Sequence, residues 1–256
     1  MEAAWHGVAD AYDRSFATLC DGVADLVAAR LGGLRPRGQV LDVGCGTGRL
    51  AHRLADEGLD VLALDPDPEM VEATRARLAG RGEVGTGALP RLDLSTGAVG
   101  GLVANFVLNH VDDPAAAAAE CARVLAPGGP LFATVWPATP TPQALLWGEV
   151  LDEAGALRPE PQRLAPDLDY PRTPDGLGGL LTDAGIDVVE AGPVRWRWEV
   201  DADDFLAGAT AVGTFGEVWR ANDAATRERV RTVWSERTAG TRLGFDVEAV
   251  LVLGIR

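Results

Sequence analysis

The residues with the clearest chemical potential form a glycine-rich segment near residue 45. Asp42-Val43-Gly44-Cys45-Gly46-Thr47-Gly48 places three glycines at every second position after an acidic residue. Glycine lets the backbone turn tightly and lets a ligand approach closely, because no Cβ stands in the way. The segment lies between a short apolar run at 40–43 and a helical pattern that begins near residue 50. This order predicts a ligand-binding turn between a strand and a helix.

A second acidic residue is placed to act together with this turn. Asp65 ends the next apolar run, 21 residues after Gly44. In this architecture a carboxylate at that position can bind the ribose hydroxyls of a cofactor. The dinucleotide fingerprint G-x-G-x-x-G is not met, because Arg49 takes the place of its third glycine. A nicotinamide-dependent oxidoreductase is therefore a less favoured alternative.

The composition excludes several other kinds of chemistry. All 23 basic residues are arginine, so there is no lysine for a Schiff base, for pyridoxal phosphate or for a P-loop. The three cysteines and three histidines are too scattered to indicate a disulfide framework or a metal site. A formal charge of −15 repels phosphate backbones, so no nucleic-acid partner is expected. No signal peptide or 18-residue apolar run is visible, so we expect a cytoplasmic protein without a membrane span.

The elements that must position these residues alternate along the first half of the chain. Apolar runs at 40–43, 61–64, 102–108 and 131–136 predict buried strands, and helical patterns lie between them. Such repeated β-α units indicate a parallel sheet with helices on both faces. In open sheets of this kind, ligands bind at the carboxyl ends of the strands. The glycine turn and Asp65 are therefore expected at one edge of an α/β sheet.

The composition changes outside this core. The segment 36–135 contains only two aromatic residues, Phe106 and Phe132, and all seven tryptophans lie outside it. We infer a cofactor-binding core with a helical cap that supplies large apolar side chains. The expected organisation is N-terminal helices closing over the cofactor at 1–35, the core at 36–136, a cap insertion at 137–173, a core helix and strand at 174–199, a helical cap insertion at 200–241, and a final core strand at 242–256.

Four stretches of this sequence resemble a known family. They are VLDVGCGTGRLAHRLA, VLALDPDPEMVEATRARL, NFVLNHVDDP and ECARVLAPGGPLFATVW. They are similar to the class I S-adenosylmethionine-dependent methyltransferases, especially the small-molecule branch related to the ubiquinone-biosynthesis methyltransferases. The resemblance is strong over residues 36–136 and weaker elsewhere. It implies a Rossmann-like doubly wound seven-stranded sheet of order 3-2-1-4-5-7-6, with strand 7 antiparallel, and S-adenosylmethionine as the cofactor.

The resemblance also implies roles for individual residues. Asp42 would open the cofactor motif, and Gly44, Cys45, Gly46 and Gly48 would line the methionine part. Asp65 would bind the ribose hydroxyls, while Pro66 and Met70 would pack near the adenine. Further expected contacts come from Tyr12, which would close over the methionine moiety, and from Asn105, which would face it.

Two positions depart from the family pattern. The family usually places an aspartate after the third strand, where this chain has Gly85-Thr86-Gly87-Ala88-Leu89. Backbone groups of Ala88 and Leu89 would then hold the adenine. Gly100 stands where an acid usually opens the fourth strand.

The expected function is transfer of a methyl group from S-adenosylmethionine to O, N or C of a small molecule by in-line displacement. His110 follows the fourth strand and is the candidate general base, with His6 as the second choice. The simpler interpretation of His110 is a residue that enters the next helix and bonds the Asp112–Asp113 turn. The alternative function is a non-methylating descendant of the fold, such as a cyclase or binding protein. The acceptor and the oligomeric state stay open.

Overall fold

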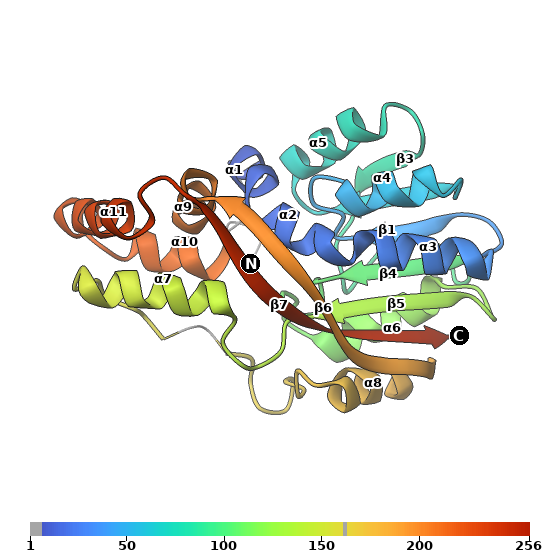
Figure 1. The fold of residues 1–256 in the computed structure, drawn as a ribbon. Helices are drawn as coiled ribbons and strands as arrows, with labels where there is room; N and C mark the ends of the chain where they lie inside the picture. Colours follow the sequence, from blue (N-terminus) through green and yellow to red (C-terminus); the bar gives the residue numbers. More distant parts are fainter. Residues whose placement is uncertain (1–6, 161–162) are drawn as a thin grey trace.

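A seven-stranded sheet forms the centre of the molecule in this computed structural model, which describes residues 7–160 and 163–256. The strand order is β3-β2-β1-β4-β5-β7-β6, and β7 runs antiparallel to both of its neighbours (Figure 1). The expected order and orientation are thus confirmed. The strands are β1 (Val40–Val43), β2 (Val61–Asp65), β3 (Glu83–Thr86), β4 (Gly101–Asn105), β5 (Pro130–Val135), β6 (Asp187–Asp201) and β7 (Arg242–Ile255).

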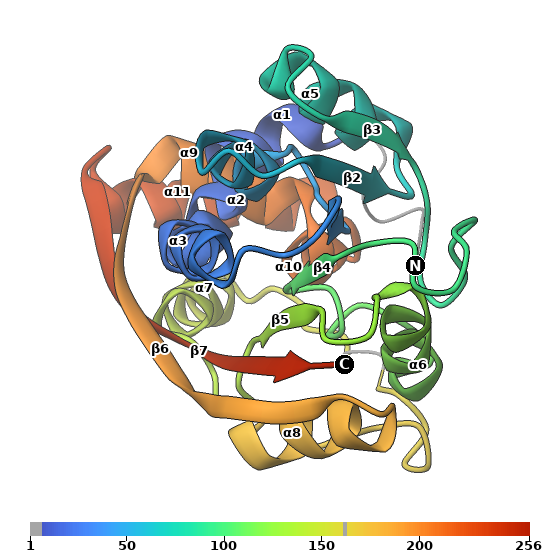
Figure 2. The ribbon, with the colours of Figure 1, turned by 90° about the vertical axis from the view of Figure 1, so that its right-hand side faces the viewer.

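Helices cover both faces of the sheet (Figure 2). Neighbouring residues of a strand point to opposite faces, so Val40 packs in one apolar cluster and Leu41 in the other. The Val40 cluster holds buried side chains of the helices α3, α4 and α5, and the Leu41 cluster holds those of α6 and α8. The helices of these two layers are α3 (Ala24–Leu34), α4 (Arg49–Asp56), α5 (Pro68–Leu78), α6 (Pro114–Val124) and α8 (Pro174–Asp183).

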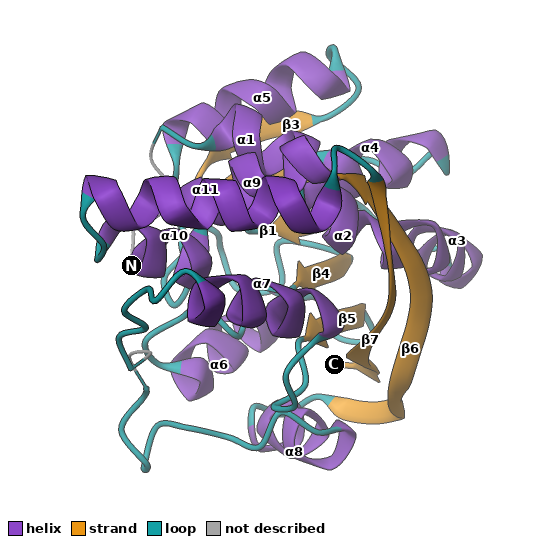
Figure 3. Ribbon diagram, turned by 60° about the vertical axis from the view of Figure 1, so that its left-hand side comes forward, coloured by secondary structure: helices purple, strands orange, loops and turns teal. Residues whose placement is uncertain are grey.

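A second group of helices packs against the outer halves of the long strands β6 and β7 (Figure 3). Its core is aromatic: the Phe205 and Trp234 rings stack with centroids 4.9 Å apart, and Trp147 is 2% exposed beside them. Aromatic side chains bury large apolar areas, which explains why the tryptophans concentrate in this part of the sequence. These helices are α7 (Pro142–Glu153), α9 (Ala202–Ala211), α10 (Gly213–Arg220) and α11 (Ala224–Thr238).

The N-terminal segment crosses from this helical group to the sheet. The helical pattern from Phe16 to Leu34 is interrupted, because a 3-10 turn at Asp21–Val23 separates α2 (Phe16–Cys20) from α3. At Gly22 a Cβ would lie 2.1 Å from Nε1 of Trp196, so only glycine allows this close approach. The short helix α1 (Ala9–Arg14) precedes α2 and contacts α9 and α5. Among residues 7–160 and 163–256, no helix is both long and apolar enough to cross a membrane.

Candidate cofactor and acceptor site

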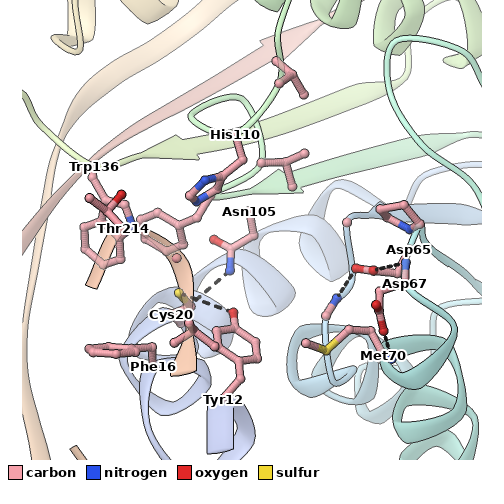
Figure 4. A pocket seen from close by; sticks show the side chains of 18 of the residues that line it. Tyr12, Phe16, Cys20, Asp65, Asp67, Met70, Asn105, His110, Trp136 and Thr214 are labelled. Atoms are coloured by element: carbon pink, nitrogen blue, oxygen red, sulfur yellow. Dashed lines mark hydrogen bonds between the residues drawn. The ribbon is translucent and has the colours of Figure 1, made fainter. Parts of the chain in front are cut away.

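A cavity of about 1450 Å³ opens at the carboxyl ends of the parallel strands. Its wall joins the loop after β1, the end of β2, the loops after β3 and β4, and residues of α1, α2, α7 and α10. Ligand pockets usually measure about 300–1,000 Å³. The cavity therefore has room for a cofactor together with a second small molecule. Figure 4 shows the side chains around it.

The glycine turn forms one side of the wall. Gly44 and Gly46 line the cavity with φ angles of +67° and +55°, a left-handed conformation that glycine adopts without strain. Gly48 is also left-handed, at +79°, but it caps α4 and is not part of the wall. A Cβ on Gly48 would lie 2.8 Å from the Thr74 side chain. Gly48 therefore serves the close packing of α4 against α5, while Gly44 and Gly46 face the ligand space.

Asp65 is held beside this turn by two backbone amides. Its Oδ2 accepts a hydrogen bond from the Gly46 N–H at 2.9 Å, and its Oδ1 accepts one from the Asp67 N–H at 3.0 Å. Burial raises the pKa of Asp65 to about 6, so the carboxylate is charged at neutral pH. A carboxylate has about four lone-pair sites, of which two are used here. Since Asp65 lines the cavity, the remaining sites suit the two hydroxyls of a ribose.

Asp42 and Cys45 lie behind the turn. Neither of them lines the large cavity; they line a separate space of about 40 Å³, to which Tyr12 and Cys20 also contribute. Burial, reinforced by the charge of Asp65, raises the pKa of Asp42 to about 8. Its Oδ2 finds no hydrogen-bond partner in the described part of the chain. Burial also raises the pKa of the Cys45 thiol, which is therefore protonated at neutral pH and is not a nucleophile.

Tyr12 closes the cavity from the N-terminal side (Figure 4). Its hydroxyl lies 3.9 Å from Sγ of Cys20, and burial raises its pKa. The next residue, Asp13, anchors α1: its Oδ1 accepts bonds from the Thr47 hydroxyl at 2.6 Å, from Arg77 at 2.8 Å and from Nε of Arg49 at 3.1 Å. Sequence reasoning missed this network, because no local pattern relates Asp13 to residues that follow it by 34 to 64 positions.

The end of β4 supplies a further part of the wall. Asn105 is fixed on both sides, since its Oδ1 accepts the Thr134 hydroxyl at 2.6 Å and its Nδ2 donates to the Cys20 carbonyl at 3.4 Å. The strand expected to reach residue 108 ends at Asn105. Phe106 is left-handed, with φ +58°, and its ring stacks on Trp136 with centroids 4.0 Å apart. Such strained residues cluster at functional sites.

His110 lies in the loop after β4, and its imidazole points into the cavity near Asn105 and Trp136 (Figure 4). His110 lines this cavity, and burial lowers the pKa of the imidazole. His110 is therefore neutral at neutral pH and can accept a proton. His110 is not the N-cap of α6, because the Asp113 carboxylate accepts a hydrogen bond from the Ala116 N–H at 2.9 Å. The other candidate base, His6, lies outside the described residues.

The residues expected around an adenine also meet at the wall. Pro66, Met70, Ala88 and Leu89 all line the cavity. Gly100, the second departure from the family pattern, directly precedes β4, and a Cβ on it would lie 1.7 Å from the Arg37 carbonyl oxygen. The fold thus requires glycine there.

The wall opposite the glycine turn comes from α2, from the residue after β5 and from the helices α7 and α10, and it was not predicted residue by residue. It is largely apolar, with Phe16, Trp136 and Phe215 among the residues that line it. Gln143 is the buried polar side chain in this wall: it is 4% exposed, and its Oε1 has no hydrogen-bond partner among the described residues. No sequence motif marks Gln143, because the surrounding segment matches no family pattern.

Comparison with known proteins shows which proteins the core of this chain resembles. Residues 41–133 match the model described as "Methyltransferase domain". An uncharacterised methyltransferase of Mycobacterium tuberculosis is 49% identical over 100 residues, which are 38% of this chain and 39% of that protein. A ubiquinone biosynthesis O-methyltransferase of Xanthomonas oryzae pv. oryzae is 39% identical over 125 residues, which are 47% and 52% of the two chains. The matched segments thus span about half or less of these relatives' length.

The likeness of the whole fold is broader than that of the sequence. The crystal structure of the [4+2]-cyclase SpnF superposes with a TM-score of 0.53 at 18% identity and covers 91% of this chain and 81% of that one. The strand order and the sequence matches agree on the same core. Residues 41–133 thus resemble a methyltransferase domain, and the sheet around them has the strand order expected for the class I S-adenosylmethionine-dependent methyltransferases.

Proposed function

We propose that this protein transfers a methyl group from S-adenosylmethionine to O, N or C of a small molecule, by in-line displacement. The observation that supports this most strongly is the placement of Asp65. Its side chain lines a cavity with room for two small molecules, and the Gly46 and Asp67 amides hold its carboxylate in place. This is an arrangement suited to a ribose beside a glycine turn.

The cofactor half of the cavity is built from the core. Asp65 accepts the ribose hydroxyls, and Pro66 and Met70 flank the adenine. Backbone groups of Ala88 and Leu89 take the place of the family's aspartate at the adenine. Gly44 and Gly46 let the methionine part approach the backbone.

The acceptor half is built from Asn105, His110, Trp136 and the helical group. S-adenosylmethionine supplies, when bound, an activated methyl group that the nucleophile takes with its own electron pair, while the carbon–sulfur pair stays on sulfur. The residues of this chain align the nucleophile and exclude water. His110, neutral and in the cavity, accepts the proton that an O–H or N–H nucleophile releases.

The direct test is to identify the ligand that the protein retains or binds. Mass spectrometry of small molecules released from freshly purified protein should find S-adenosylmethionine or S-adenosylhomocysteine, and calorimetry should show that both bind. Release of a nicotinamide dinucleotide would support the oxidoreductase alternative. A protein that binds neither sulfur compound would contradict the proposal.

A non-methylating function is the second candidate. One observation favours it: a similar fold occurs in SpnF, which is named a [4+2]-cyclase. The two candidates differ in whether methyl groups leave the cofactor. Conversion of S-adenosylmethionine to S-adenosylhomocysteine that depends on an added acceptor supports methyl transfer, and product formation without such conversion supports the second candidate.

A further inference from the structure

The charged side chains of the cavity wall are all of one sign. Asp65, Asp67, Asp112 and Asp113 line the cavity, and no arginine is among the described residues that do so. This is unusual in a chain with 23 arginines, which elsewhere pair with carboxylates such as Asp13, Asp21 and Glu120. A carboxylate or phosphate on the acceptor would thus enter a mostly apolar space without a cationic partner, which is costly.

Helix ends offset only part of this negative charge. The helices α7 and α10 begin at the cavity wall, and a helix N-terminus carries about half a positive charge. α7 begins with Pro142, which has no N–H to donate. On the loop that carries His110, Asp112 and Asp113 contribute two full negative charges, although Asp113 also caps α6. The carboxylates outweigh the helix ends.

An aromatic surface lies on the acceptor side of the same cavity. The Phe106 and Trp136 rings stack at an interplanar angle of 14°, and Trp196 packs behind them with its centroid 6.0 Å from that of Trp136. We call the Phe106–Trp136 pair the aromatic platform. Its backbone is held firmly, because the Phe106 N–H donates to the Thr134 carbonyl at 3.1 Å and the Trp136 N–H to Oδ1 of Asn109 at 3.2 Å. Phe106 is 5% exposed, so the half-buried Trp136 ring supplies most of the open surface of this platform, and flat rings and cations both bind well to aromatic faces.

Gln143 is a buried amide side chain beside this wall. Its unpartnered Oε1 is enclosed in the structure, and the last torsion of a glutamine side chain is soft enough to turn the amide toward the cavity. Once the amide has turned, Oε1 can accept from a hydroxyl, amine or ammonium group, and Nε2 can donate to an oxygen, so discrimination against anions comes from the acidic wall and not from Gln143.

On the basis of the proposed function, we propose that the methyl acceptor is a planar aromatic molecule, uncharged or cationic, that stacks on the aromatic platform and carries a hydroxyl or amino group. The acidic wall disfavours acceptors that carry a carboxylate, phosphate or sulfate. Three probes with the same ring test this: 2-naphthalenemethanol, 2-naphthylmethylamine and 2-naphthoate. They are uncharged, cationic and anionic at pH 7.5.

The experiment is calorimetric titration of each probe into the full chain saturated with S-adenosylhomocysteine, which lacks the positive sulfur. We expect the alcohol and the amine to bind, and 2-naphthoate to bind at least tenfold more weakly. Trp136→Leu should weaken the alcohol and the amine about fivefold or more, with the melting temperature recorded to verify folding. Asp112→Asn should reduce the ratio of the amine's affinity to the naphthoate's affinity about twofold. Asp175→Asn, an exposed matched control on α8, should leave this ratio unchanged.

Two results would overturn the inference: naphthoate binding as tightly as the alcohol, or none of the three probes binding while S-adenosylhomocysteine binds. Failure of S-adenosylhomocysteine itself to bind is a different outcome, because it contradicts the proposed function and not only the acceptor class.

Discussion

Replacement of Asp65 by alanine should weaken cofactor binding at least tenfold. The carboxylate has two lone-pair sites left for ribose hydroxyls, and a hydrogen bond to a charged group contributes about 1.5–3 kcal/mol. Burial raises the pKa of Asp65 to about 6, so at pH 7.5 nearly all of the carboxylate is charged and can accept these hydrogen bonds. A net loss of about 1.4 kcal/mol or more corresponds to the tenfold change.

The same carboxylate gives the binding a pH dependence with a definite sign. Below about pH 6 the free protein carries a protonated Asp65, which is a weaker acceptor, so affinity should fall as the pH is lowered through 6. Asp65→Asn should bind weakly at every pH and lose this step. Calorimetry with S-adenosylhomocysteine between pH 5 and 8 measures both effects, with Asp175→Asn as the matched control. Unchanged affinity in a folded Asp65→Ala variant would refute the assignment.

Further predictions concern the base, the turn and the anchor of α1. His110→Ala should lower kcat about a hundredfold while cofactor affinity is retained. In the unmutated protein, kcat/KM should fall only below pH 6.5, because burial lowers the imidazole pKa. A loss of kcat smaller than fivefold in His110→Ala would show that His110 is structural. Gly46→Val should abolish cofactor binding in a protein that still folds. Gly48→Val should lower the melting temperature more, because its Cβ would meet Thr74. Equal effects of the two variants on the melting temperature would contradict the assignment of Gly46 to binding and Gly48 to packing. Asp13→Ala should weaken cofactor binding several-fold by releasing α1 and Tyr12, and unchanged calorimetry would show that the anchor is not needed.

The core of the fold could be predicted because its signals are local. Apolar runs set the strands, glycines mark the turn after β1, and Asp67 caps α5 by accepting the Glu69 and Met70 amides. Asp65 follows from the same local order, since it ends the strand beside that turn. These features depend on residues within a few positions of one another, so they can be recognised from the sequence alone.

The acceptor wall could not be predicted because its parts meet only in three dimensions. Phe16, Trp136, Gln143 and Phe215 come from four separate segments, and each would also suit an ordinary apolar core. The end of β4 was misjudged for a related reason: the apolar run continues to residue 108, but Phe106 turns left-handed to stack on Trp136. Tertiary packing decides that conformation, and no local propensity indicates it.

We infer that the glycine turn and Asp65 hold S-adenosylmethionine at the carboxyl edge of the sheet, with the acceptor space beyond it. A crystal structure with S-adenosylhomocysteine bound tests this most directly. We expect ribose hydroxyls within hydrogen-bond distance of Asp65, adenine between Met70 and Leu89, and the sulfur facing the space lined by His110 and Trp136. A ribose bound away from Asp65, or a sulfur turned away from His110 and Trp136, would contradict it.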